Sequence, residues 1–456
     1  MIIIQKGQVV LEGQTLQADL AIDAGKIVKI APQIEVQAGD EVRAAEGCYI
    51  FPGFIDPHVH MQMTNAITTT ADSYETGTKA AIYGGTTTII NFATADMGMS
   101  LRDVLAREKA KADGQSSCHY LFHCEMIDVN ENTLAELKEL SAEGLRSVKA
   151  YLAYTFRIGD HDLYKTIKAC HEAGLLLEAH CENGAMLDAV LEDLVAEGKT
   201  QMRYKAFAHP TAAEADSIGT MGRIAKLLGA HVHVVHLSSK EGLEEVRHQR
   251  AQGVNITVET CPQYLYLDQS CYENEDLLQA AKYVCAPPPR QQQDREAILN
   301  GIVQGDIQTL ATDHCAYRLE GQKDQSLEDF RSCPGGLPGV EERATLFYTK
   351  LVDSGLISPE RFAELMATNS AKLYKLYPQK GVIREGSDAD LVIYDPKGRS
   401  QLSARVLHSA AQNTVYEGVE VAGSVRDVYL DGKLTLDHGR LVREKEGRFL
   451  GSMKKE

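Results

Sequence analysis

The sequence predicts an α/β protein in which a (β/α)₈ barrel of the TIM type carries a small β-sandwich domain built from both ends of the chain. Three observations support this fold class. The middle of the 456-residue chain alternates eight strand-like segments with helical patterns. Both ends consist of short strand-like runs separated by turns. Six residues of metal-ligand type recur along the middle region, mostly at strand ends, where barrel enzymes keep their chemistry.

The two ends of the chain are expected to fold together as one domain. Near the C-terminus, Val425–Leu430 and Lys433–Leu436 flank Asp431-Gly432, a dipeptide that favours a tight hairpin turn. The N-terminal region has the same pattern of short strands and turns, and the middle differs from both. The barrel is therefore expected as an insertion between two halves of the terminal domain. The expected boundaries are residues 1–50 plus 379–456 for the terminal domain and 51–378 for the barrel.

The middle region is expected to form the eight β/α units. Helical periodicity covers Leu101–Ala112, Thr133–Ala142 and Leu163–Ala173. Two more helices, near Ala185–Glu197 and Ala213–Leu228, account for the long spacing between the fifth and sixth strands. The expected strands are Phe54–His60, Thr86–Phe92, His119–Met126, Ser147–Leu152, Leu175–His180, His231–His236, Asn255–Thr260 and Gln308–Asp313.

Composition indicates a soluble globular protein. The hydrophobic content of 44% and the charged content of 24% are ordinary for this class. A net charge of -17 opposes binding to nucleic acid or to an anionic membrane, and no apolar run is long enough to span a bilayer. The ten cysteines include no CxxC pair, which is typical of reduced thiols in a core. We therefore expect a cytoplasmic protein with no nucleic-acid or membrane partner.

Five residues of metal-ligand type fall at or near the ends of strand-like runs. His58 and His60 stand two residues apart in one run, so their side chains point to the same face and can bind one ion together. His180, His236 and Asp313 close later runs. The alternative for the histidines is packing in a core, and for Asp313 it is a loop-capping role. We expect that structural role for four other histidines, His119, His123, His231 and His233.

Lys149 lies inside the apolar run Val148–Leu152, where an unpaired ammonium is costly. One interpretation is that the long side chain reaches the barrel mouth with its charge in water. The other is that neutral Lys149 reacts with carbon dioxide, and the resulting carbamate bridges two cations. Two ions would share a bridging hydroxide, because metal binding lowers the pKa of water towards about 7.

Several motifs, taken together, resemble one family, the cyclic amidohydrolases, and within it the dihydropyrimidinase/hydantoinase branch. The resemblance spans nearly the whole chain. It is carried by the sequences of residues 51–60, Tyr74–Ala81, Gly84–Thr87, Glu259–Leu265, Thr312–His314 and Gly386–Val392.

The resemblance implies a role for each candidate residue. His58, His60 and Asp313 correspond to ligands of the more buried ion, and His180 and His236 to ligands of the second. Lys149 resembles the carboxylated bridging lysine. Tyr154 resembles the tyrosine that hydrogen-bonds the developing oxyanion. Asp313 would also take the proton of the attacking hydroxide and deliver it to the leaving nitrogen. The full set of implied metal ligands is His58, His60, Lys149, His180, His236 and Asp313.

The residues after His60 narrow the branch. Dihydroorotases typically have a Leu-Arg pair there, and allantoinases an Asn-Glu-Pro-Gly run. This chain has neither and instead carries Met61-Gln62-Met63, which resembles the dihydropyrimidinase pattern. In the family, two later segments hold the substrate's ring amide largely through backbone groups. They correspond here to Ala286 and Gly335, which depart from the usual serine and asparagine. Met63 and Tyr151, with Phe156 and Ile158, are candidates to line a pocket for the ring substituent, although core packing is an equal interpretation for Tyr151.

The expected activity is metal-dependent hydrolysis of a cyclic amide. Ring opening of 5-substituted hydantoins or dihydropyrimidines would give N-carbamoyl amino acids. The substrate is then a small cyclic ureide or imide, the cofactors are two divalent ions, and zinc is expected, with manganese or cobalt as substitutes. The family implies a homo-oligomer, a tetramer or a dimer. The alternatives are allantoinase or dihydroorotase activity and, more remotely, a non-catalytic scaffold of the same fold.

Overall fold

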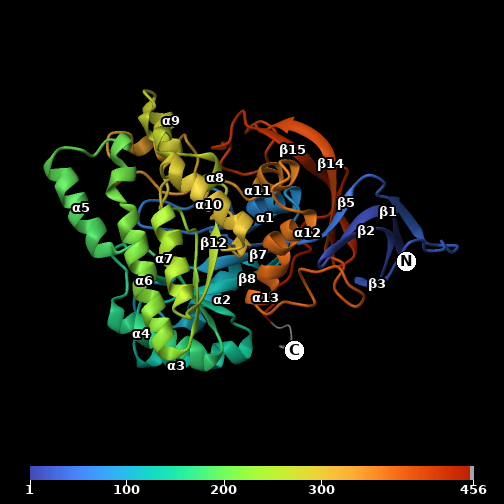
Figure 1. The fold of residues 1–456 in the computed structure, drawn as a ribbon, viewed down its shortest axis with the longest axis horizontal. Helices are drawn as coiled ribbons and strands as arrows, with labels where there is room; N and C mark the ends of the chain where they lie inside the picture. Colours follow the sequence, from blue (N-terminus) through green and yellow to red (C-terminus); the bar gives the residue numbers. More distant parts are fainter. Residues whose placement is uncertain (452–456) are drawn as a thin grey trace.

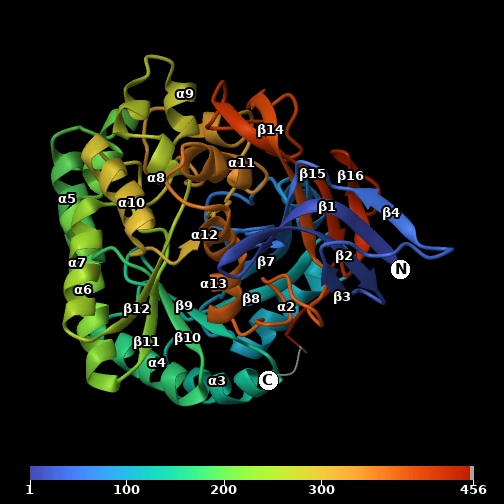
Figure 2. The ribbon, with the colours of Figure 1, turned by 45° about the vertical axis from the view of Figure 1, so that its right-hand side comes forward.

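The computed structural model describes residues 1–451 and contains the expected barrel (Figures 1 and 2). Eight parallel strands form one sheet in sequence order, so each strand lies beside its chain neighbour. Their side chains are almost entirely buried, as expected for parallel strands covered by helices. The strands are β6 (Phe54–Val59), β7 (Thr86–Ala93), β8 (His119–Glu125), β9 (Ser147–Tyr151), β10 (Leu176–His180), β11 (His231–Val234), β12 (Asn255–Thr260) and β13 (Thr309–Leu310).

The barrel closes between β6 and the segment that follows β13. The His60 N–H donates to the His314 carbonyl at 2.7 Å, and Val59 forms a parallel bridge to His314. The Thr312 hydroxyl donates to the buried Asp56 carboxylate at 2.7 Å. β13 is shorter than the expected Gln308–Asp313, because Asp313 adopts a positive φ of 54° and leaves the strand conformation.

Helices cover the outside of the barrel, and two of them, α5 and α6, fill the long connection between β10 and β11 as expected. The three helical patterns singled out in the sequence are present as α2, α3 and α4. Two later helices, α11 and α12, continue into π-helical segments, Tyr348–Asp353 and Glu364–Thr368. The helices are α1 (Tyr74–Tyr83), α2 (Leu101–Ala112), α3 (Glu131–Glu143), α4 (Asp160–Ala173), α5 (Gly184–Ala196), α6 (Thr211–Leu228), α7 (Lys240–Ala251), α8 (Gln263–Tyr266), α9 (Leu277–Lys282), α10 (Gln292–Gln304), α11 (Arg343–Phe347), α12 (Pro359–Ala363) and α13 (Asn369–Leu373). Within residues 1–451, none of them is both long and apolar enough to cross a membrane.

The two ends of the chain build a second, nine-stranded sheet beside the barrel, at the right of Figure 1. Most of its pairings are antiparallel, but β1 pairs in parallel with β4 and β5. Its apolar side chains enclose a core of their own. The strands are β1 (Ile2–Leu11), β2 (Gln14–Asp23), β3 (Lys26–Ala31), β4 (Glu41–Ala44), β5 (Tyr49–Pro52), β14 (Leu391–Gln401), β15 (Glu420–Leu430), β16 (Lys433–Asp437) and β17 (Arg440–Leu441).

A buried ion-pair cluster joins this sheet to the N-terminal end of β8. The Lys380 ammonium lies 2.6 Å from an oxygen of Asp390 and 3.2 Å from one of Asp431. His119, at the start of β8, lies 3.3 Å from the same Asp431 oxygen. Lys380, Asp390 and Asp431 all come from the C-terminal part of the expected terminal domain, so the cluster ties that part to the barrel. The boundaries at residues 50 and 379 stay predictions.

Candidate metal centre

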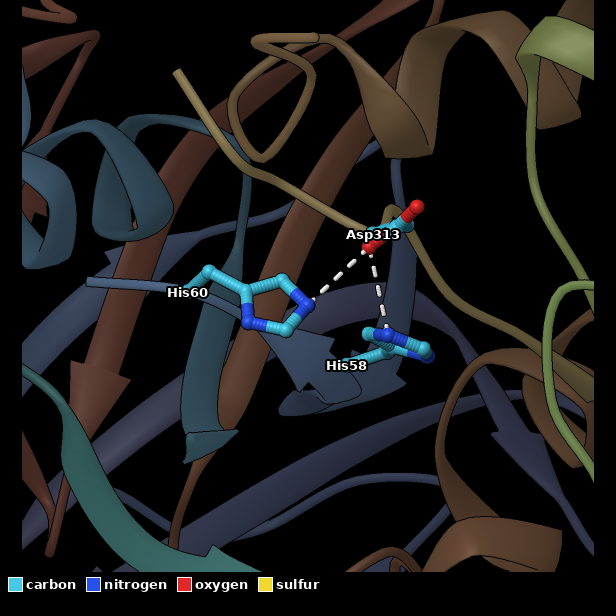
Figure 3. A group of neighbouring side chains, drawn as sticks. All are labelled: His58, His60 and Asp313. Atoms are coloured by element: carbon cyan, nitrogen blue, oxygen red, sulfur yellow. Dashed lines mark ion pairs between the residues drawn. The ribbon is translucent and has the colours of Figure 1, made fainter. Parts of the chain in front are cut away.

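His58, His60 and Asp313 converge at the C-terminal mouth of the barrel (Figure 3). His58 is the last residue but one of β6 and His60 directly follows the strand, so the strand pleat turns both rings to one side. The Nε2 atoms of both histidines lie 3.2 Å from Oδ1 of Asp313. Three potential ligand atoms, from the end of the first barrel strand and from the segment after the last, therefore meet within reach of one ion.

His180 and His236 form a second pair beside this group. Nδ1 of His180, the last residue of β10, lies 3.0 Å from Nε2 of His236, two residues after β11. The ring of His236 lies 5.3 Å from that of His58, measured between centroids. The structure thus gathers the five sequence-predicted histidine and aspartate side chains into two neighbouring sets of ligand atoms.

Lys149 is the third residue of β9 and is fully buried, deeper in the barrel than the other candidates. Its ammonium lies 4.4 Å from the ring centroid of Phe92, which also packs on His58 and His60. None of the ion pairs found within residues 1–451 involves it. Burial lowers the pKa of Lys149, against the opposing effect of Glu178 and Asp313. Burial therefore shifts Lys149 towards its neutral amine, while the buried carboxylates around it oppose that shift.

Two buried carboxylates fix which ring nitrogen each histidine presents. Glu259, in β12, holds Nδ1 of His58 at 2.7 Å, which leaves Nε2 towards Asp313. Glu182 holds Nε2 of His180 at 2.8 Å, which leaves Nδ1 towards His236. Such partners orient metal-binding histidines and select their tautomer. Neither glutamate was predicted from the sequence. The only local signal for each is an acidic residue near the end of a buried strand or just after one.

The charges of His58 and Asp313 stabilise each other. Burial alone would lower the pKa of His58, but Glu259 and Asp313 outweigh it and raise the pKa to about 9. Burial would raise the pKa of Asp313, but His58 and His60 hold it well below its usual range. Burial lowers the pKa of His60 to about 4. Asp313 is therefore an anionic carboxylate beside two histidine rings. Once His58 loses its proton, these donor types suit a divalent transition ion.

Unpartnered ring nitrogens do not separate the candidate ligands from the other histidines. Nδ1 of His60 and of His236 and Nε2 of His119 and of His233 are all buried without a hydrogen-bond partner in the described part of the chain. The difference lies in the other contacts. His123 bonds the Pro57 carbonyl at 2.7 Å, and Nδ1 of His233 lies 2.9 Å from the Thr257 hydroxyl. Nε2 of His60 and Nε2 of His236 instead face another candidate ligand, Asp313 and His180 respectively.

Tyr154 lies at the mouth beside the second pair, with its ring 5.0 Å from that of His180. It is only half-buried, and a positive φ of 72° turns the chain at this point. Tyr151 packs against Phe156 with centroids 5.0 Å apart, but its hydroxyl donates to Glu125 at 2.7 Å. An aromatic wall therefore flanks the ligands, and the hydroxyl of Tyr151 is already engaged.

The segments around Ala286 and Gly335 lie side by side. A Cβ on Gly335 would be 3.9 Å from the Cα of Cys285, and Gly336 donates its N–H to the Val284 carbonyl at 2.8 Å. Gly335 is exposed and Ala286 half-buried. Met63 belongs to the loop after His60, where its N–H donates to the Thr70 hydroxyl, which in turn donates to the His60 carbonyl.

Comparison with known proteins identifies the family. The model of the Amidohydrolase family matches residues 49–435. The chain belongs to this family. It is 38% identical to a D-hydantoinase of Rhizobium radiobacter over 97% of this chain and 96% of the relative, and 37% identical to a D-phenylhydantoinase of Escherichia coli O81 (strain ED1a) over 98% and 97%. These relatives confirm the resemblance found in the sequence.

Solved structures of amidohydrolase relatives confirm the fold class. A dihydropyrimidinase from Brevibacillus agri NCHU1002 superposes with a TM-score of 0.96 at 36% identity, covering 98% of both chains. A D-hydantoinase from a Bacillus sp. AR9 superposes with a TM-score of 0.97 at 37% identity over the full length of both chains.

Proposed function

We propose that this amidohydrolase opens the ring of 5-substituted hydantoins or dihydropyrimidines by hydrolysing a cyclic amide, giving N-carbamoyl amino acids. The observation that carries the proposal is the pairing of two ligand sets around buried Lys149 at the barrel mouth. The similar D-hydantoinases and the run Met61-Gln62-Met63 favour this activity over that of an allantoinase or dihydroorotase. The complete ligand set argues against a non-catalytic scaffold.

Two divalent ions, zinc by preference and manganese or cobalt as substitutes, would be held by His58, His60 and Asp313 and by His180 and His236. When bound, they would lower the pKa of water and polarise the amide carbonyl. Lys149 would link the two sets as a carbamate. Its neutral amine forms a nitrogen–carbon bond to carbon dioxide, and one amine proton leaves to water.

The chain's own groups would then manage the proton and the substrate. Asp313 accepts a proton from the attacking water and returns it to the leaving amide nitrogen. The Tyr154 hydroxyl donates to the oxygen on which negative charge develops. Backbone groups of Ala286 and Gly335 hold the ring amide. Met63 and Tyr151 flank the ring substituent, through the ring of Tyr151 and not its engaged hydroxyl.

The carbamate is tested directly on enzyme loaded with ¹³C-labelled bicarbonate and metal. We expect a carbamate carbon signal in the wild type, and we expect Lys149→Ala to lose both that signal and the binuclear metal content. Lys380→Met, which removes another buried lysine at the terminal sheet, should keep both. Near-normal activity in a Lys149→Ala sample of verified metal content would contradict the bridging role.

We also propose a homo-oligomer, a tetramer or dimer, in the cytoplasm. Large apolar side chains are exposed on and after α5, including Met186 and Val195, each 39% exposed, and Phe207, 59% exposed. Contacts between subunits would remove such apolar side chains from water. All ten cysteines are free thiols, as in a reducing compartment. Light scattering should give a mass two or four times that of the chain, and a monomeric mass would contradict the assembly.

A further inference from the structure

Lys323 is a second buried lysine near the barrel mouth, and it is fully excluded from solvent. Its ammonium donates to three backbone carbonyls, those of Ala281 at 3.2 Å, Val284 at 3.0 Å and Pro334 at 3.1 Å. The ion pairs found in residues 1–451 give it no carboxylate partner. Burial lowers the pKa of Lys323, although nearby thiols oppose this. All three donors of the cation are thus used on backbone oxygens.

A buried ammonium is a costly way to fill a core position. An apolar side chain of similar length would occupy the same volume without removing a charge from water. What the ammonium adds is a fixed geometry, because three donors on one nitrogen hold three carbonyls at one point. Two of those carbonyls, from Val284 and Pro334, belong to chain segments about fifty residues apart. The same two segments are also joined by a backbone hydrogen bond from the Gly336 N–H to the Val284 carbonyl.

The carbonyls bound by Lys323 set the direction of the backbone N–H groups that follow them in the chain, and these belong to the segments proposed to hold the ring amide. In a planar trans peptide the N–H points opposite to the carbonyl of the same unit. The Pro334 carbonyl shares its peptide unit with the Gly335 N–H, so binding that carbonyl to Lys323 aims the N–H away from the lysine. Within residues 1–451 the Gly335 N–H donates to no backbone carbonyl. The Val284 carbonyl is fixed in the same way, directly before Cys285 and Ala286.

The loop of Pro334 is also tied to the segment after β13, which carries Asp313. The Cys315 N–H donates to the Leu337 carbonyl at 2.9 Å, and His314 forms a parallel bridge to Leu337. Gly336 lies so close to this segment that a Cβ would meet the Cys315 carbonyl oxygen at 2.3 Å. Lys323 therefore bonds directly to the segment of Val284 and to the loop of Pro334, and that loop in turn contacts the segment of Asp313.

We propose that Lys323 is a positioning residue for substrate binding, which sets the spacing between the backbone at Val284–Ala286 and the backbone at Pro334–Gly336. This inference rests on the proposed function, because it takes these two segments as the ones that hold the ring amide. Lys323 touches neither the substrate nor the ligand sets in this account; it acts through the two segments.

The test compares Lys323→Met with Lys380→Met as a matched control. Both changes remove a buried ammonium, but Lys380 bonds Asp388, Asp390 and Asp431 at the terminal sheet. We measure kcat, KM and bound metal for wild type and both variants with hydantoin and 5-phenylhydantoin. For Lys323→Met we expect KM to rise about tenfold, by a similar factor for both substrates, with kcat and metal content nearly unchanged. The equal factor follows because both substrates share the ring amide.

A second variant keeps the test decisive if Lys323→Met does not fold. Lys323→Arg retains the charge, but a planar guanidinium cannot aim three donors at one point, so KM should still rise. If a folded Lys323 variant has an unchanged KM and only a lower thermal stability, as expected for Lys380→Met, the inference about Lys323 is overturned and the proposed function is not affected. Absence of turnover by the wild type on these rings would overturn the proposed function and the inference with it.

Discussion

His58 and His180 each present one ring nitrogen to the candidate centre because a carboxylate holds the other. Glu259 bonds Nδ1 of His58, and Glu182 bonds Nε2 of His180. His58 therefore presents Nε2 to the candidate centre, whereas His180 presents Nδ1. Glu182 is itself held by His209 at 3.0 Å. The geometry of the candidate centre therefore depends on the carboxylates that hold the histidine rings as much as on the rings themselves.

Replacing Glu182 by glutamine should weaken metal binding at the second set. An amide can leave His180 in the wrong tautomer, and loss of such a partner typically costs about 10–100-fold in metal affinity. Metal content after dialysis against a weak chelator measures this. Glu108→Gln is the control, since Glu108 is buried but bonds Tyr74 and Lys111, away from the ligands. Equal metal retention by the two variants would show that Glu182 does not orient His180.

Replacing Tyr154 by phenylalanine should lower kcat about 10²–10³-fold with a smaller effect on KM, because the hydroxyl is proposed to donate to charge that develops during the reaction. Steady-state kinetics on a hydantoin reports both constants. Tyr164→Phe, at a tyrosine 36% exposed on α4, is the matched control and should leave them unchanged. A Tyr154→Phe enzyme with normal kcat would remove this tyrosine from the reaction.

At the scale of elements, the helix ends are set by glycines in different surroundings. Gly144, which ends α3, has a φ of 117°, and a Cβ there would meet the Gly451 carbonyl oxygen at 1.8 Å. Gly174, which ends α4, has a φ of 66°, and its nearest neighbour would be the Lys375 ammonium at 3.6 Å. Both positions need a left-handed backbone, but only Gly144 also lacks space.

Alanine substitutions should separate these two causes. Gly174→Ala should lower the free energy of unfolding by about 1–2 kcal/mol, the cost of a left-handed backbone. Gly144→Ala should cost about 1–3 kcal/mol more, because the C-terminal backbone must move. Paired thermal or denaturant unfolding curves measure the difference. Equal losses would mean that the close approach of Gly451 contributes nothing to stability.

The sequence predicted elements well where burial is continuous. Buried parallel strands appear mostly as apolar runs, so the barrel strands were predicted within a few residues of their observed ends. β12, which alternates apolar and polar residues, was predicted with its observed ends, Asn255 and Thr260. β13 was predicted too long because the positive φ of Asp313 comes from the site and not from local propensity. Glu259 was not found, since its partner His58 lies 201 residues away and a single acidic residue gives no local signal.

At the scale of the whole molecule, the barrel mouth collects groups that are remote in sequence. His58 and Asp313 meet because the barrel closes between β6 and the segment after β13. The terminal sheet braces the opposite end of β8 through Lys380, Asp390 and His119. The spacing of ligands along the chain could thus predict which residues meet, while their hydrogen-bond partners depend on the closed barrel.

The assembled site is expected to hydrolyse a cyclic amide. The first measurement is therefore ring opening by enzyme purified with zinc or manganese and bicarbonate. The substrates are dihydrouracil, hydantoin, 5-phenylhydantoin, allantoin and dihydroorotate, each followed by loss of ultraviolet absorbance and by product mass. We expect turnover of the hydantoins or dihydrouracil to N-carbamoyl products. Turnover of allantoin or dihydroorotate alone, or no turnover of any of these rings by protein with two metals bound, would contradict this function.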